Sequence, residues 1–157
     1  MKKILLFLLI IASFTAYAQK SGFRSFRVSA DRLGTQNATL FGQMLARQHN
    51  LSESAIADLH NKFNSNWGDL AMGLELHRLS KRPVTSVIDA YGKNRGWGDI
   101  AKDLGIKPGS DEFHRMKRDL RQRDTEWSQE WKRKVPPAGK NKKMKFRNSP
   151  SKSKGKK

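Results

Sequence analysis

The residues with the clearest chemical potential are the lysines and arginines at the C-terminal end of the chain. Between Lys132 and Lys157 there are twelve of them and no acidic residue. A flexible run of cations binds polyanions by releasing condensed counterions, so its affinity falls steeply as salt rises. The residues expected to bind are Lys132, Arg133, Lys134, Lys140, Lys142, Lys143, Lys145, Arg147, Lys152, Lys154, Lys156 and Lys157. A segment that only keeps the protein soluble is the alternative.

The charge of the chain is concentrated in this segment. Removing its twelve cations, together with Lys2 and Lys3, from the formal net charge of +18 leaves +4 for residues 19–131. The high isoelectric point therefore says little about the folded part. The expected partners are polyanions bound without sequence specificity: nucleic acid outside the cell, lipopolysaccharide or an acidic membrane surface.

A second candidate binding site is a five-residue sequence motif that occurs twice in near-identical form, thirty residues apart; we call each copy a word. Trp67, Gly68 and Asp69 begin one of them, and Trp97, Gly98 and Asp99 begin the other. An indole beside a glycine and a carboxylate suits the binding of a sugar or peptide. Because the word recurs at the same place in a repeated unit, we favour a structural role. In this role the indoles fill space between helices, the glycines permit close approach, and Asp69 and Asp99 cap the helices.

Metal binding and catalysis have little support. His49, His60, His77 and His114 form no i, i+4 pair, and Glu75 and His77 lie two positions apart, where helical side chains diverge. No nucleophile elbow, phosphate-cradling loop or His-Glu-x-x-His word is present. We therefore expect no metal, no cofactor and no enzymatic activity, with a small metal-dependent or glycan-active enzyme as a remote alternative.

Residues 100–106, followed by Ser110 and a basic helix, resemble the helix-turn-helix of DNA-binding proteins. Ala101 would allow a tight helix crossing and Gly105 would make the turn. However, Pro108 and Gly109 lengthen the turn, and Asp111 falls where an inner aliphatic residue is expected. Asp111 and Glu112 would also face the phosphates. We therefore do not expect sequence-specific DNA recognition.

Residues 91–110 include Gly96-Trp97-Gly98, Ile100-Ala101 and Leu104-Gly105. In these words the chain resembles an uncharacterised family of small exported bacterial helical proteins with G-W-G-x-I-A-x-x-L-G words. The resemblance covers roughly residues 50–120. It implies a bacterial source and a helical fold, and it implies no activity or site residue.

The first eighteen residues read as a secretory signal peptide. Lys2 and Lys3 form the basic start, Ile4 to Ala12 the apolar run, and Ala16-Tyr17-Ala18 the cleavage site. We expect a periplasmic or secreted protein with no membrane span after cleavage. The chain has no cysteine, so packing alone must stabilise it.

The hydrophobic spacing predicts an all-α protein, a compact bundle of about six helices. Residues 19–37 are expected to form an irregular arm, residues 38–134 the helical domain, and residues 135–157 a disordered lysine-rich tail. Inside the domain, units of about 52–82 and 83–109 repeat a helical hairpin. Helices are expected to begin near Leu40, Ser52, Trp67, Pro83, Trp97 and Ser110.

The function predicted from these features is that of an exported, non-enzymatic interaction protein whose cationic tail associates with polyanions. The alternative is a structural or protein-binding module of the bacterial cell envelope, whose tail is incidental. Deleting the tail separates the two, since only the first should lose its partner.

Overall fold

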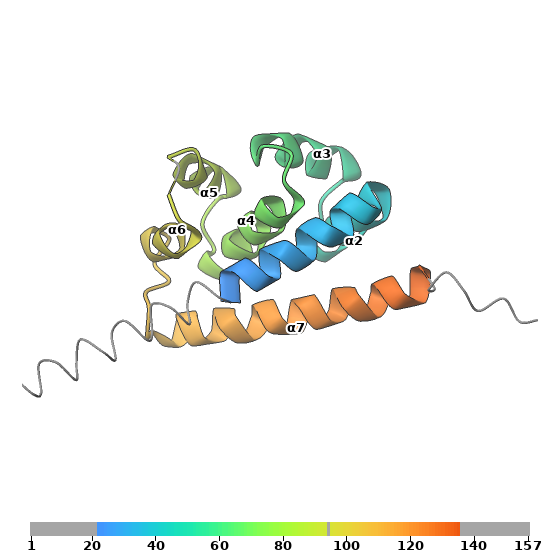
Figure 1. The fold of residues 1–157 in the computed structure, drawn as a ribbon. Coiled ribbons are helices and arrows are strands. Elements are labelled where there is room, and N and C mark those ends of the chain that lie inside the picture. The colour runs from blue at the N-terminus through green and yellow to red at the C-terminus, as the bar shows by residue number, and fades with distance from the viewer. Residues whose placement is uncertain (1–21, 94, 136–157) are drawn as a thin grey trace, which may run out of the picture.

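The computed structural model describes residues 22–93 and 95–135, and these form an all-α fold of seven helices. The predicted fold class is therefore confirmed. Residues 22–36 make the first helical segment, and α2 follows it in a nearly continuous rod above α7 (Figure 1). The remaining bounds are α2 Ala38–His49, α3 Glu53–Lys62, α4 Trp67–Ser80, α5 Val84–Tyr91, α6 Trp97–Asp103 and α7 Asp111–Lys134.

The prediction of an irregular arm over residues 19–37 is wrong for residues 22–36. Phe23, Phe26, Ala30 and Leu33 recur at helical spacing, and each is at most 6% exposed. Val28, which would join Phe26 on the buried face of an extended segment, is 60% exposed. The four buried residues give this segment an apolar stripe that packs on the bundle.

Short polar caps set the helix starts where the sequence places them. The side chains of Ser52, Asn66 and Ser110 each accept a hydrogen bond from the backbone N–H three residues later, at 3.1, 2.8 and 3.2 Å. These bonds satisfy helix N–H groups that have no intrahelical partner. At the other end of α6, Gly105 adopts a φ of +93°, which favours glycine and ends the helix. The predicted helix starts near Ser52, Trp67 and Ser110 are confirmed. The prediction that Asp69 and Asp99 cap their helices is wrong, because Asn66 caps α4 and α6 has no side-chain cap.

Helix α4 is the centre of the bundle. It contacts α2, α3, α5 and α7, and it lies among them in Figure 1. All residues from Gly68 to Leu76 are buried, so this helix is enclosed on every side rather than amphipathic.

The described part of the chain holds no helix that is long and apolar enough to cross a bilayer.

The two repeated hairpins are α3–α4 and α5–α6. Both repeated words begin a helix, α4 at Trp67 and α6 at Trp97, as predicted. The second copy is shorter, because α6 has 7 residues and α4 has 14. The repeat therefore supplies one central helix and one peripheral helix.

Replacing Gly68 by alanine is expected to lower the free energy of unfolding by about 1–3 kcal/mol. An added Cβ would overlap with the backbone carbonyl oxygen of Arg27, which cannot rotate away as a side chain could. Gly92→Ala is the control: its Cβ would lie 3.5 Å from the Ile88 carbonyl oxygen, and we expect a gain of roughly 0.4–1 kcal/mol. Urea unfolding measures both; equal effects would contradict the close helix crossing at Gly68.

Candidate functional site

The two repeated words meet at Asp69. Its carboxylate accepts hydrogen bonds from the indole Nε1 of Trp97 at 3.0 Å and from the Tyr91 hydroxyl at 2.9 Å. Arg27 pairs with the same carboxylate. Burial and the neighbouring Asp69 raise the pKa of Tyr91. Asp69 thus joins helix 22–36, α4, α5 and α6 at one point.

Trp67 makes packing contacts of a different kind. Its ring stacks on His60 with centroids 4.0 Å apart and meets Phe41 edge-on at 5.8 Å. Gly34 lies directly against the indole, where a Cβ would collide with the ring. These are the contacts expected of a structural role for the first word.

The second copy of the word is not equivalent to the first. Trp97 is 7% exposed and stacks on Tyr91 with centroids 5.5 Å apart. Asp99 is exposed, whereas Asp69 is 7% exposed and bonded to three side chains. The shared sequence therefore places the two carboxylates in different environments.

A buried ion cluster surrounds Glu75, which is 0% exposed. Arg78 donates to its carboxylate through Nε and Nη2 at 2.9 and 2.8 Å, and Arg123 donates through Nε at 2.9 Å. Arg78 also donates to Asp119 at 3.0 Å. Burial opposes the charge of Arg78, but Glu75 outweighs this and raises the pKa of Arg78. The cluster ties α4 to α7.

The sequence analysis missed this cluster. Its only sequence signal is that Glu75 is the single acidic residue inside the otherwise apolar stretch from Leu70 to Leu76. A charge in such a stretch must be buried and therefore needs a partner. One partner, Arg78, lies three residues away, but the other, Arg123, is 48 residues away in sequence and cannot be identified from local spacing.

His49 contacts the same cluster. Its side chain is 4% exposed, and its Nε2 lies 3.6 Å from a carboxylate oxygen of Glu75. Burial lowers the pKa of His49 from 6.5 to about 4; the charge of Glu75 opposes this, while Arg123, Arg78 and His77 add to it. The folded protein therefore keeps His49 neutral at neutral pH.

Acidification is expected to destabilise the fold through His49. The unfolded chain takes up the proton near pH 6.5 and the folded chain only near pH 4, so the stabilisation is complete above pH 6.5 and is lost as pH falls. Between pH 7.5 and 5 the loss is about 2 kcal/mol. Urea unfolding at both pH values measures it. His49→Gln should flatten the difference, whereas His114→Gln, at an exposed site, should leave it unchanged; identical pH dependence in all three proteins would refute this role.

The four histidines do not converge on a metal site. The His77 ring Nδ1 bonds to the Arg82 carbonyl oxygen at 2.6 Å, His60 stacks on Trp67, and His114 is exposed. No group of three potential ligands lies close enough to hold a metal ion within residues 22–93 and 95–135.

The solvent-exposed face of α7 carries a row of positively charged side chains. Arg115, Arg118 and Arg121 are exposed at helical spacing, and none pairs with a carboxylate among the described residues. Lys132, Arg133 and Lys134 are exposed in the last turn of the same helix. We call these six residues the α7 basic stripe. From Arg115 to Lys134 it is about 28 Å long.

Three of the four acidic side chains of α7 beyond its first turn pair with arginines that do not belong to the stripe. Asp119 pairs with Arg78, Glu126 with Arg123, and Glu130 with Arg47 at 2.6 Å. Asp119 and Glu130 are half-buried, whereas the side chain of Glu126 is 42% exposed. Glu130 also lies 3.4 Å from the Lys134 ammonium. These carboxylates are thus paired with other cations, and Arg115, Arg118 and Arg121 are left exposed without a carboxylate partner among the described residues.

Of the twelve cations predicted to bind polyanions, three belong to the stripe. The other nine lie outside the described residues: Lys140, Lys142, Lys143, Lys145, Arg147, Lys152, Lys154, Lys156 and Lys157. Arg115, Arg118 and Arg121 were not predicted. The sequence feature that could have identified them is their three-residue spacing, which places them on the helix face opposite the buried Phe113, Met116 and Leu120.

The start of α7 does not suit the helix-turn-helix resemblance. Asp111 and Glu112 are exposed in its first turn, where a recognition helix would approach phosphates.

Comparison with models of known families, with curated proteins and with solved structures finds no match for the chain. The resemblance to exported bacterial helical proteins stays a prediction.

Proposed function

We propose that the protein is an exported, non-enzymatic interaction protein that binds polyanions, using the α7 basic stripe together with the cations that follow it. The single observation that carries this proposal is the pattern of charge pairing on α7. Asp119, Glu126 and Glu130 are paired with Arg78, Arg123 and Arg47, respectively. The exposed Arg115, Arg118 and Arg121 therefore have no carboxylate partner among the described residues.

An extended stripe of one sign fits a partner with regularly spaced negative charges. Arginines three residues apart on a helix lie side by side, so neighbouring guanidiniums can contact successive anionic groups. The stripe ends in Lys132, Arg133 and Lys134, and the remaining cations follow in the sequence. A polyanion on α7 would therefore continue along the C-terminal segment.

The test is the salt dependence of binding to duplex DNA, used as a probe polyanion. Replacing Arg115, Arg118 and Arg121 by glutamine is expected to reduce the slope of log affinity against log salt by about 2–3, since each lost phosphate contact contributes about 0.9. Lys62 on α3, Lys93 in the turn after α5 and Lys102 on α6 are exposed outside α7, and the same three-fold replacement there is the matched control.

The control variant should keep the slope of the unmodified chain. Equal slopes for the two triple variants would show that the stripe plays no part and would leave binding, if any, to the C-terminal segment. A chain that binds DNA equally at low and high salt would overturn the proposal as a whole.

A further inference from the structure

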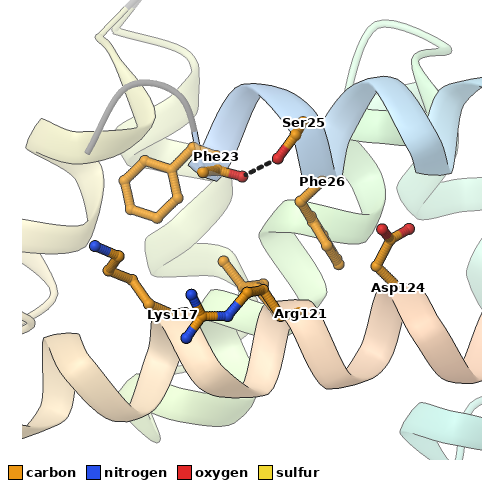
Figure 2. A pocket seen from close by; sticks show the side chains of 8 residues that line it. Phe23, Ser25, Phe26, Lys117, Arg121 and Asp124 are labelled. Carbon is orange, nitrogen blue, oxygen red and sulfur yellow. Dashed lines mark hydrogen bonds between the residues drawn. The ribbon is translucent and has the colours of Figure 1, made fainter. Parts of the chain in front are cut away.

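A small cavity lies between the first turns of helix 22–36 and the middle of α7 (Figure 2). Its volume is about 110 Å³, and its inner walls are the side chains of Phe23, Phe26 and Leu120. An apolar cavity of about 150 Å³ holds a benzene molecule, so this one has room for about four or five carbon atoms.

The rim of this cavity is charged. Lys117 and Arg121 stand one helical turn apart on α7, and Figure 2 shows both side chains beside the apolar walls. Neither forms an ion pair with any carboxylate in the described part of the chain. The Lys117 ammonium lies 5.6 Å from the centre of the Phe113 ring. Two cations are thus available at the mouth of an apolar space.

Asp124 completes the lining. Its Oδ1 is shielded from water and has no hydrogen-bond partner among the described residues. A buried acceptor of this kind is costly unless a donor reaches it. Its carboxylate also repels an anion, which places the anionic group of any ligand toward Lys117 and Arg121.

We propose that this cavity binds an amphiphilic anion, a short alkyl or acyl chain that carries a phosphate or carboxylate head. The alkyl or acyl chain lies against Phe23, Phe26 and Leu120, and the anionic head contacts Lys117 and Arg121, on the side away from Asp124. An anion without an alkyl chain would leave the apolar cavity empty, and an uncharged alkyl chain would leave both Lys117 and Arg121 unpaired.

This inference rests on the proposed function, because Arg121 belongs both to the α7 basic stripe and to the cavity rim. It names the class of anion that the folded part selects. Nucleic acid has phosphates that can contact the α7 basic stripe, but it has no alkyl chain that can fill the cavity. An anionic amphiphile has both an anionic group and an alkyl chain. The folded part should therefore prefer the amphiphile at salt concentrations that weaken binding to nucleic acid.

The experiment is a calorimetric titration of the full chain with monomeric hexyl phosphate, with inorganic phosphate and hexanol as the two partial ligands. We expect one hexyl phosphate per chain, bound at least about tenfold more tightly than either partial ligand. Amide NMR shifts should move at residues 22–26 and 117–124. Equal affinity for hexyl phosphate and inorganic phosphate would overturn the proposal.

Two variants locate the site. Ser25 is exposed at the rim, so Ser25→Phe should fill the cavity and weaken hexyl phosphate binding by at least about tenfold. Gln129→Phe adds the same ring to exposed α7 surface away from the cavity and should keep full affinity. Lys117→Gln should also weaken binding without filling any space. Unchanged affinity in Ser25→Phe and Lys117→Gln, with native circular dichroism, would exclude the cavity.

DNA binding by the same variants separates this inference from the proposed function. Ser25→Phe should leave the salt dependence of DNA binding unchanged, because it removes no charge. Loss of hexyl phosphate binding with DNA binding intact supports the cavity site. DNA binding without any hexyl phosphate binding in the unmodified chain refutes the cavity site and leaves the proposed function standing.

Discussion

Replacing Glu75 by glutamine is expected to lower the free energy of unfolding by about 3 kcal/mol. Glutamine has almost the same size as glutamate, so the packing stays and only the charge is lost. Arg78 and Arg123 would then lose the carboxylate that both contact, although each keeps a second one, Asp119 or Glu126. This remaining pairing puts the cost at the lower end of the range for breaking a buried ion pair.

Urea unfolding at neutral pH measures the effect, and Glu126→Gln is the matched control. Glu126 contacts the same Arg123 at 2.8 Å, but its side chain is 42% exposed. An exposed pair of this kind contributes only about 0–1 kcal/mol. Similar losses in the two variants would mean that the Glu75 cluster does not hold α4 to α7.

The helices of the bundle could be predicted from local sequence because local chemistry sets their ends. Ser52, Asn66 and Ser110 cap their helices with bonds to residues three positions on, which is a purely local interaction. The repeated Trp67 and Trp97 likewise start helices at the same point of each unit. Signals of this range are visible in a single sequence.

The first helical segment was missed for a physical reason. Phe23, Phe26 and Val28 alternate only loosely with Arg24, Arg27 and Ser29, and so short a stretch does not fix a period. Ala30 and Leu33 decide in favour of the helix, because both are buried on the same stripe as the phenylalanines. Alanine is a weak hydrophobic signal, so the longer period was not apparent.

The candidate site could be predicted only in part. The lysine-rich segment is evident from composition, but the net charge of +4 over residues 19–131 conceals how the charges of α7 are arranged. Whether Arg118 or Asp119 faces solvent depends on Arg78, which is remote in sequence. Only the tertiary fold reveals that three of the acidic side chains pair with other arginines and leave a basic stripe.

Removal of residues 136–157 is expected to have the largest effect on binding. These residues hold nine of the twelve C-terminal cations, whereas the α7 basic stripe remains. Each phosphate contact contributes about 0.9 to the slope of log affinity against log salt, so the slope should fall in magnitude by at least about 4. At about 0.1 M salt the affinity should fall by more than about 100-fold. Weak binding should persist through the stripe.

The most direct test of polyanion binding is therefore this salt series on duplex DNA, with the intact and shortened chains side by side. We predict a steep linear fall for the intact chain and a shallower one for the shortened chain. The residual slope should fall by about 2–3 more when Arg115, Arg118 and Arg121 are also replaced by glutamine, which leaves only the cations in the last turn of α7. An intact chain that fails to bind at low salt, or a shortened chain with an unchanged slope, would contradict this account.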